Sequence, residues 1–485
     1  MRVEPHPSVR LESVTTATIP GLLPVLLGAQ LLVILDISAV NVALPDMSRD
    51  LSIPAGDIGW VITSYSLIFG SLLLLGGRAA DLLGRRRLFL AGLSVFTVAS
   101  LASAASVDAS VLFTARAAQG LGAAMLSPAA LSIITTAFRG RDRIRALGAW
   151  GAVGGAGAAI GVLMGGVLTN VSDWRAIFYI NLPVGVALAV AATKVVPPDS
   201  ARPRWRGLDL RGASLATLSL AAILYAVSQA ANAGWASAQT LTLGFVGLAG
   251  LIAFAATEAG MNQPLLRVQR LADRAVGGGF LLMVIASAVL FGMFLLSSIY
   301  LQDVYGTSPL ETGLAFLPVA VTTGMGAHLG SHLVPRFGVR VPMAAGFALS
   351  ALGMMLLAGA DRDSTYVVSL LPGMLLAGLG LGVVLVGVAF SVLTGVQDEE
   401  SGMLSGLNTT GHEVGGALGV AALVSIATAA TRSGSGFMEA DGIADAFLAA
   451  GILAGVGSLV ALTVLPSART FLAKLRLTPT PMLLH

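Results

Sequence analysis

Two side chains of opposite charge lie inside long apolar stretches, where an isolated charge is costly. Asp36 lies eight residues before the end of the stretch 20–44, and Arg116 lies six residues after the start of the stretch 110–137. At about 1.5 Å per helical residue, the two side chains reach a similar depth below one surface. Because an arginine stays charged, we expect Asp36 to pair with it. We interpret the pair as a proton-coupling element, and a permanent ion pair that only fixes helix packing is the alternative.

A second acid, Glu413, lies ten residues into the apolar stretch 403–428, near the middle of a membrane. Its neighbour His412 points to a different face of the helix, so the carboxyl has no obvious partner and should be protonated much of the time. We predict that Glu413 carries protons; a neutral hydrogen-bonding glutamic acid in a packing helix is the alternative. Glu258, near the inner end of its stretch, can reach water and is interpreted as structural.

The elements that hold these residues must be membrane helices. The chain is 55% apolar and 11% charged, with a mean hydropathy of +0.86, so we predict an integral membrane protein. It has no cysteine, which excludes disulfides, thiolate metal sites and a cysteine nucleophile. Neither lysine, Lys194 or Lys474, follows a glycine, so there is no phosphate-binding loop of an ATPase. The net charge of +3 does not indicate nucleic-acid binding, because basic residues in such chains fix orientation.

We count fourteen apolar stretches long enough to cross a bilayer. They are 20–44, 58–76, 88–106, 110–137, 144–168, 177–196, 208–230, 239–260, 277–301, 310–331, 341–359, 367–394, 403–428 and 444–466. With both termini in the cytoplasm, the loops on the outer side hold only four of the 28 basic residues, Arg49, Arg175, Arg362 and Arg432. The excess of positive charge inside predicts this orientation.

An arginine-rich segment, 76–87, joins the second and third stretches, and we expect it to be a short cytoplasmic turn. Gly77 and Gly84 can adopt dihedral angles that suit a tight turn. Asp81 is the only acid in the segment, and it can accept hydrogen bonds from a helix N-terminus. We expect this contact to latch two halves of a helical bundle and to release when they move. An ordinary positively charged loop is the alternative.

This segment resembles the loop between spans two and three of the major facilitator superfamily, which reads roughly G-x-L-a-D-r-x-G-r-r. The matching positions are Gly77, Asp81, Gly84, Arg85 and Arg86. Ala79 and Leu82 replace the Leu and Arg that are usual in the family, so a weaker latch is expected.

The two halves of the chain repeat. A shift of 254 residues maps Gly84 onto Gly338 and Arg86 onto Arg340, as expected for two related bundles with a substrate site between them. Two extra stretches lie between the halves, so the chain resembles the 14-span drug:proton antiporter-2 family. The expected fold is all-α, with two six-helix bundles and an inserted two-helix hairpin. The expected parts are a tail 1–19, a bundle 20–196, a linker with the hairpin 197–276, a bundle 277–466 and a tail 467–485.

Other stretches carry the same resemblance. Residues 35–45 are similar to the span-one signature L-D-x-T-I-V-N-V-A-L-P, and residues 174–183 are similar to W-R-W-I-F-x-I-N-x-P. Arg116 also starts a match to R-x-x-Q-G-x-G. The polar residues that we assign to the substrate cavity are Asn41, Gln119 and Asn408.

The fifth stretch resembles the antiporter signature G-x3-G-P-x2-G-G, but Val162 replaces the proline. The glycines that fit are Gly157, Gly161, Gly165 and Gly166. Small residues at this spacing predict close helix packing without a proline kink. His328 and His332 have a spacing that suits a metal, but no third ligand is apparent, so no metal site is predicted.

The resemblance implies a proton-coupled efflux antiporter in the plasma membrane that exports amphipathic small molecules, drugs or toxic compounds, by alternating access. It implies no cofactor beyond the proton gradient and no enzymatic activity. The expected partners are the lipid bilayer, the small-molecule substrate and protons, with no nucleic acid, and we expect a monomer. A dedicated exporter of one natural product or siderophore is an alternative. From another class, a non-transporting membrane receptor or assembly protein on the same scaffold is also open.

Overall fold

The computed structural model describes residues 21–138, 140–199, 209–261, 264–393, 398–429 and 439–477. These residues form helices and connecting turns, without a strand among them. The predicted all-α class is confirmed. The predicted N-terminal tail 1–19 and the last part of the predicted C-terminal tail, 478–485, lie outside these ranges.

The first part of the chain forms seven helices. They are α1 (Leu22–Asp50), α2 (Trp60–Leu83), α3 (Arg85–Ala104), α4 (Ala109–Ala137), α5 (Gly140–Val171), α6 (Ala176–Tyr179) and α7 (Asn181–Val195). The inserted hairpin follows as α8 (Leu210–Ala233) and α9 (Ala238–Ala259).

The second part begins with a 3-10 turn, η1 (Val268–Ala272), and contains a short π-helix, η2 (Tyr300–Val304). Its α-helices are α10 (Arg274–Ile299), α11 (Pro309–Phe337), α12 (Arg340–Ala358), α13 (Tyr366–Ser369), α14 (Leu371–Leu393), α15 (Asp398–Ala429), α16 (Ala440–Val464) and α17 (Ala468–Leu477).

Thirteen segments of the described chain are long and apolar enough to cross a membrane. They correspond to thirteen of the fourteen predicted stretches. The remaining stretch, 144–168, falls in α5, where the described apolar part, Ile160–Val171, is shorter. The protein is therefore a multi-pass membrane protein.

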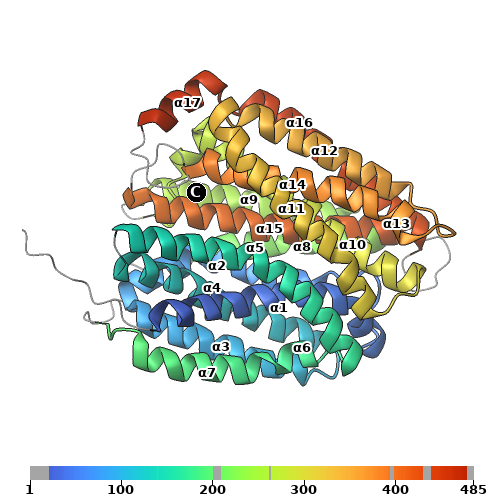
Figure 1. Cartoon of the computed structure of the whole chain (residues 1–485), viewed down its shortest axis with the longest axis horizontal. Coiled ribbons are helices and arrows are strands. Elements are labelled where there is room, and N and C mark those ends of the chain that lie inside the picture. The colour runs from blue at the N-terminus through green and yellow to red at the C-terminus, as the bar shows by residue number, and fades with distance from the viewer. Residues whose placement is uncertain are drawn as a thin grey trace, which may run out of the picture.

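The helices form two groups that pack against each other (Figure 1). In the first group α4 packs on α2 and α3, and α5 packs on α1. In the second group α11 packs on α14, α12 on α14 and α16, and α10 on α15. The largest contacts between the groups are those of α2 with α15 and of α5 with α11. These two pairs of helices form the main interface between the groups, and we call them the two seams.

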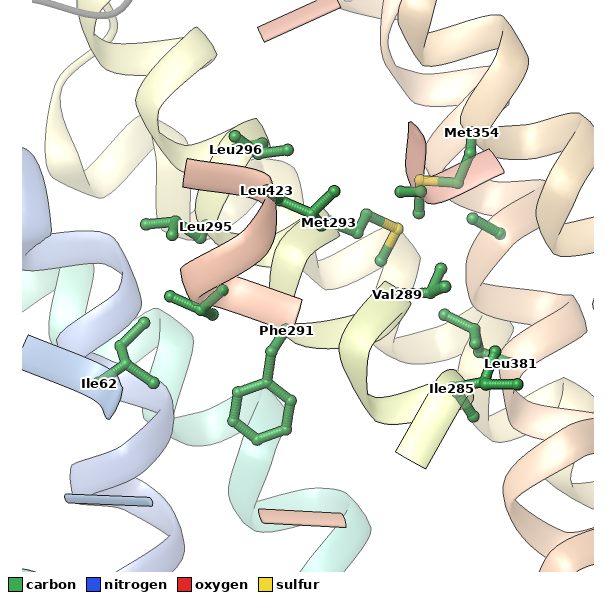
Figure 2. Packing of buried hydrophobic residues seen from close by; sticks show 14 of the residues in the cluster. Ile62, Ile285, Val289, Phe291, Met293, Leu295, Leu296, Met354, Leu381 and Leu423 are labelled. Carbon is green, nitrogen blue, oxygen red and sulfur yellow. The ribbon is translucent and has the colours of Figure 1, made fainter. Parts of the chain in front are cut away.

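One apolar cluster continues across the boundary between the halves. Ile62 of α2 and Leu423 of α15 belong to the same cluster of buried residues as Phe291 and Leu295 of α10. Figure 2 shows these side chains with their neighbours. Lipid is as apolar as these side chains, so the contact between the halves is stabilised by van der Waals packing rather than by removal of apolar surface from water.

The hairpin covers one of the two seams. Leu224 of α8 is fully buried in a small cluster with Leu67 of α2 and Ala417 of α15. Thr217 Oγ1 of α8 donates to Ser71 Oγ of α2 at 3.1 Å. Helix α9 packs mainly on α8. Helix α8 therefore contacts both halves where α2 meets α15.

The predicted turn at 76–87 is shorter than expected. Helix α2 continues to Leu83 and α3 begins at Arg85, so only Gly84 is outside a helix. Gly84 has φ +108°, a conformation that L side chains rarely adopt. Charged residues can continue a helix beyond the apolar core because they lie at the level of water and lipid headgroups.

Candidate functional site

The side chains of Asp36 and Arg116 contact each other inside the N-terminal half. Asp36 lies on α1 and Arg116 on α4, and Arg116 Nη1 donates to Asp36 Oδ2 at 2.5 Å. Both side chains are almost completely buried. The structure therefore shows the pairing that was expected from their similar depth. It supplies the opposite charge that a buried guanidinium requires.

Amide and hydroxyl groups of α3, α4 and α7 complete the surroundings of the ion pair. Gln119 Nε2 and Asn181 Nδ2 donate to Asp36 Oδ1 at 3.1 and 2.8 Å. Both amides also donate to Ser100 Oγ, at 2.8 and 3.3 Å. Gln119 Oε1 accepts from Arg116 Nη1 at 2.9 Å. Every oxygen of Asp36 thus has a donor, and breaking the network would leave buried polar groups unsatisfied.

Arg116 has further contacts with α2 and α6. Its Nε donates to the Val61 carbonyl at 3.1 Å. Its guanidinium lies 4.5 Å from the centre of the Tyr65 ring and 5.8 Å from that of Phe178. Cation–π contacts of this kind stabilise a desolvated charge. All these partners belong to α1–α7, so the whole network lies within one half.

Glu413 lies instead at the seam between the halves. It is on α15, is only 4% exposed, and its Oε2 accepts from Ser66 Oγ of α2 at 2.9 Å. Ser66 is the one hydrogen-bond partner of this carboxyl in the described part of the chain. A Cβ added at Gly70 would come within 2.8 Å of Glu413 Cβ, so the glycine allows α2 to approach α15. His412 faces α10, with Nδ1 2.6 Å from Ser287 Oγ, and thus points away as expected.

Helix α2 connects the two candidate proton sites. The consecutive residues Tyr65 and Ser66 contact Arg116 and Glu413, respectively. The Tyr65 hydroxyl is buried and has no hydrogen-bond partner within the ranges that the structure describes. A movement of α2 would therefore change the surroundings of both sites.

The predicted glycine stripe of α5 faces α1. A Cβ at Gly161 would lie 2.7 Å from Ser38 Cβ, and a Cβ at Gly165 would lie 2.6 Å from the Ala39 carbonyl oxygen. Gly157 packs on the same helix one turn earlier. These distances are too short for any side chain, so the glycines permit backbone contact between α1 and α5.

Gly166 faces the opposite direction. A Cβ at Gly166 would lie 2.6 Å from the Pro309 carbonyl oxygen of α11, in the other half. Gly313 of α11 packs against Val162 of α5: a Cβ added at Gly313 would lie 3.1 Å from the Val162 carbonyl oxygen. Helix α5 runs without interruption from Gly140 to Val171. The four glycines thus serve two different interfaces.

Asp81 does not cap a helix in this conformation. It is about half exposed, and its Oδ1 accepts from Arg85 Nη2 at 3.1 Å, one helical turn away. Gly76, not Gly77, makes the close approach to α4, because a Cβ at Gly76 would overlap the Ala124 carbonyl oxygen. The latch between the halves stays a prediction.

The N-terminus of α3 is capped by Asp199, which follows α7. Asp199 Oδ1 accepts from Arg86 N and Oδ2 from Arg87 N, both at 3.1 Å. The Arg86 side chain also donates to the Thr193 carbonyl at 2.5 Å. A side chain at Gly84 would overlap Asp199. The capping function expected of Asp81 is thus performed by another acid, and Gly84 makes room for it.

The three predicted cavity residues have different surroundings. Gln119 is fully buried and uses its amide in the Asp36 network, so it does not line a cavity in this conformation. The side-chain oxygens of Asn41 and Asn408 are buried and have no hydrogen-bond partner among the described residues, and each can accept a hydrogen bond from a ligand. A surface groove of about 520 Å³ between α3 and α7 is lined by apolar residues and contains none of the predicted site residues.

The two histidines of α11 lie next to each other on the helix. The rings of His328 and His332 lie 4.5 Å apart, and His332 Nδ1 lies 2.9 Å from the His328 carbonyl oxygen. Among the described residues, no group of three possible ligands is found.

Several partners were missed by the sequence analysis: Asn181, Ser100, Tyr65, Ser66 and Asp199. Asn181 and Ser66 are polar residues inside apolar stretches, which is a signal that could have marked them. Nothing in the local sequence of Asp199 shows that it reaches the start of α3.

Glu258 also differs from expectation. It is 1% exposed and accepts from the Leu266 backbone at 3.0 Å, so it does not extend to water. The polypeptide that follows α9 folds back over it.

Residues 26–420 match the family model described as Major Facilitator Superfamily. The puromycin resistance protein pur8 of Streptomyces alboniger is 42% identical over 415 residues, covering 85% of this chain and 82% of that protein. The cephamycin export protein CmcT of Amycolatopsis lactamdurans is 37% identical, covering 89% and 90%. The multidrug resistance protein Stp of Mycobacterium tuberculosis (strain CDC 1551 / Oshkosh) is 35% identical, covering 82% and 74%.

Solved structures share the fold at low sequence identity. A bacterial homologue of the human lysosomal transporter Spinster, in an inward-facing and unoccupied conformation, gives a TM-score of 0.66 at 16% identity, covering 93% of this chain and 97% of that chain. A peptide transporter POT in complex with sulfate gives 0.68 at 15% identity, covering 95% and 98%.

Proposed function

The chain belongs to the Major Facilitator Superfamily, and we propose that it exports amphipathic small molecules across the membrane in exchange for protons. Relatives at 35–42% identity are named for resistance to or export of antibiotics, and they cover most of this chain. The chemistry of the interior agrees with such substrates. In the described part of the chain the buried amide oxygens of Asn41 and Asn408 have no hydrogen-bond partner. A few such polar groups in an otherwise apolar interior suit molecules that combine apolar and polar parts.

The observation that carries the proton coupling is the position of Glu413. Its carboxyl is buried at the seam between the halves and is held by Ser66 of the opposite half. Gain or loss of a proton there changes a contact between the halves, and so changes the relative free energy of two conformations. The Asp36–Arg116 network lies within one half, so we assign it to positioning of α1 and α4 near the proton path.

The contacts of α10 and α11 with the N-terminal half support a state closed at the predicted outer end. Gln302 Nε2 of η2 donates to the Val42 carbonyl of α1 at 2.7 Å, joining the halves near that end. Gly166 of α5 contacts Pro309 of α11 at the same level. Alternating access requires these contacts to break when the substrate leaves to the outside.

The test uses purified protein in proteoliposomes with an imposed pH gradient, radiolabelled puromycin as the first probe and a cephamycin as the second. We expect accumulation of a probe against its own gradient, accompanied by proton movement in the opposite direction. Accumulation that persists when the pH gradient is dissipated would contradict proton exchange. Failure of both probes and of a lipophilic dye cation to move would contradict export of this class and favour a receptor or assembly role.

A dedicated exporter of one natural product is the second candidate. It is favoured by relatives named for single compounds, such as the tetracenomycin C resistance and export protein of Streptomyces glaucescens. Competition between puromycin, a cephamycin and the dye for transport separates the two. Mutual competition supports broad specificity, and movement of a single compound supports the dedicated exporter.

The remaining assignments follow from the same proposal. The chain performs no covalent chemistry beyond moving a proton, requires no cofactor, and works as a monomer in the plasma membrane with both termini in the cytoplasm. The excess of basic residues in the predicted inner loops supports this orientation.

A further inference from the structure

Two carboxyl groups face each other at one end of the inserted hairpin. Asp209 precedes α8 and is its N-cap, and Glu258 lies near the end of α9. Asp209 is 7% exposed and Glu258 is 1% exposed. A side chain at Gly212 would overlap both Asp209 Oδ2 and Glu258 Oε1, so the two oxygens approach the same point.

Each carboxyl uses one oxygen and leaves the other without a donor. Asp209 Oδ1 accepts from Gly212 N at 2.8 Å, and Glu258 Oε2 accepts from Leu266 N at 3.0 Å. Asp209 Oδ2 and Glu258 Oε1 are buried, and in the described part of the chain they have no hydrogen-bond partner. Two such oxygens repel each other when both groups are ionised, and a single proton between them would satisfy both atoms with one hydrogen bond.

Charged residues also lie on the elements that pack around the two carboxyls. The charged residues of the packed elements are Arg211 on α8, Arg270 on η1, and Arg78 and Asp81 on α2. In the described part of the chain, neither Asp209 Oδ2 nor Glu258 Oε1 accepts a hydrogen bond from any of these residues. The side chains at the start of α15, residues 398–402, lie outside the description.

We propose that Asp209 and Glu258 form a second proton-binding site, in which one proton is shared between Asp209 Oδ2 and Glu258 Oε1. The proton comes from the water at this end of the hairpin and returns to it. When bound, it joins the start of α8 to the end of α9. Through Glu258 and the Leu266 amide, it also joins the hairpin to the segment that leads into α10. The site does not depend on the proposed transport function.

The first test is infrared spectroscopy of the full chain in lipid nanodiscs, titrated with alkali. All proteins carry Glu413→Gln, so that the carboxyl at the seam does not contribute. We expect a carbonyl band of a protonated carboxyl that disappears as the pH rises and that is missing in Glu258→Gln. Asp108→Asn is the matched control, because Asp108 is also the N-cap of a helix but is exposed and unpaired with another acid. It should keep the band.

The second measurement is thermal unfolding of the same proteins from about pH 5 to pH 8. A proton held more tightly by the folded protein stabilises it at low pH, and this contribution is lost as the pH rises. The unfolding temperature of the parent should therefore fall relative to that of Glu258→Gln as the pH rises. The glutamine can donate to Asp209 Oδ2 at every pH, so this variant should fold.

Two results would overturn the proposal. One is an infrared band that is identical in the parent, Glu258→Gln and Asp209→Asn, since no proton would then be shared. The other is a rise in unfolding temperature on adding Na⁺ or Ca²⁺ at fixed pH that Glu258→Gln abolishes, because the two oxygens would then hold a metal cation.

Discussion

The two membrane carboxyl groups differ in where their hydrogen-bond donors come from. Asp36 accepts from Arg116, Gln119 and Asn181, all in its own half. Glu413 accepts from Ser66 in the other half. A bond inside one rigid half contributes equally to two conformations that differ in how the halves are arranged, whereas a bond between the halves does not. This difference decides which residue we expect to couple protons to movement.

Glu413→Gln should abolish uphill export driven by a pH gradient. The amide imitates the protonated acid, so the halves can still rock, and substrate binding and downhill exchange should remain. Uphill and downhill transport of a probe in proteoliposomes measure the two activities separately. Glu311→Gln is the control, because Glu311 is an exposed residue in a helix-capping box that glutamine can also complete. If Glu413→Gln exports uphill as well as the parent, Glu413 is not the proton carrier, and Asp36 becomes the next candidate.

Asp36→Asn should impair uphill and downhill transport alike. It leaves Arg116 without its counter-charge in the membrane, and breaking a buried pair in this way typically costs about 3–5 kcal/mol. The unfolding temperature of the purified variant should therefore fall, unlike that of Glu413→Gln. A variant with parental stability and a selective loss of pH-driven export would instead make Asp36 a proton carrier.

Helix α5 contacts two neighbours through glycines, because its backbone is exposed to α1 on one face and to α11 on another. The stripe Gly157, Gly161 and Gly165 stays within the N-terminal half. Gly166 contacts the C-terminal half. Close contact without interlocking side chains allows α5 to slide along α11 while it stays fixed to α1.

Gly166→Ala should reduce transport and lower the unfolding temperature, since its Cβ would meet the Pro309 carbonyl oxygen at 2.6 Å. Gly324→Ala is the matched control: Gly324 is also helical, and nothing lies within 4 Å of an added Cβ. There the substitution should raise stability by about 0.5–1 kcal/mol, as alanine generally does in a helix. Equal effects at both positions would argue against a backbone contact between α5 and α11.

Asp199→Ala should lower stability, whereas Asp81→Asn should not. Asp199 caps α3, so its loss should cost about 0.5–2 kcal/mol of stability, measured by thermal unfolding.

Asp81 is exposed and pairs only with Arg85 in the described part of the chain, so the stability of Asp81→Asn should be unchanged. If Asp81 caps a helix end in the other conformation, transport should fall in Asp81→Asn while expression is unchanged. If Asp81→Asn transports at the parental rate, the segment 76–87 serves only to fix the orientation of the chain in the membrane.

The sequence was sufficient for features that depend on depth and local pattern. The Asp36–Arg116 pair follows from counting residues along two spans, and the glycines of α5 follow from their spacing. Features that depend on how distant segments meet could not be predicted. The cap by Asp199 requires the end of α7 to reach the start of α3, and the burial of Glu258 requires the chain after α9 to fold back. The length of α2 was underestimated because its last turns are polar although they are helical.

At the scale of the whole molecule, the orientation in the membrane is open to a direct test. The chain has no native cysteine, so single cysteines report location without background. Ala272→Cys, at the exposed end of η1, should react with an impermeant thiol reagent only from the cytoplasmic side. Ala236→Cys, at the exposed tip of the hairpin, should react only from outside. The measurement compares labelling of each variant in intact cells with labelling in inverted membrane vesicles. The reverse pattern would mean that every end assigned here as cytoplasmic is extracellular, and the converse.

The position of α8 has a consequence for the route that a fat-soluble compound takes. Such a compound is concentrated in the bilayer and could enter a transporter sideways, between two helices of different halves. At the seam of α2 with α15, helix α8 covers such a lateral entry route, because its Leu224 is buried in contact with residues of both helices. At the other seam, between α5 and α11, the helices meet through glycines. We therefore expect compounds dissolved in the bilayer to enter between α5 and α11 rather than between α2 and α15.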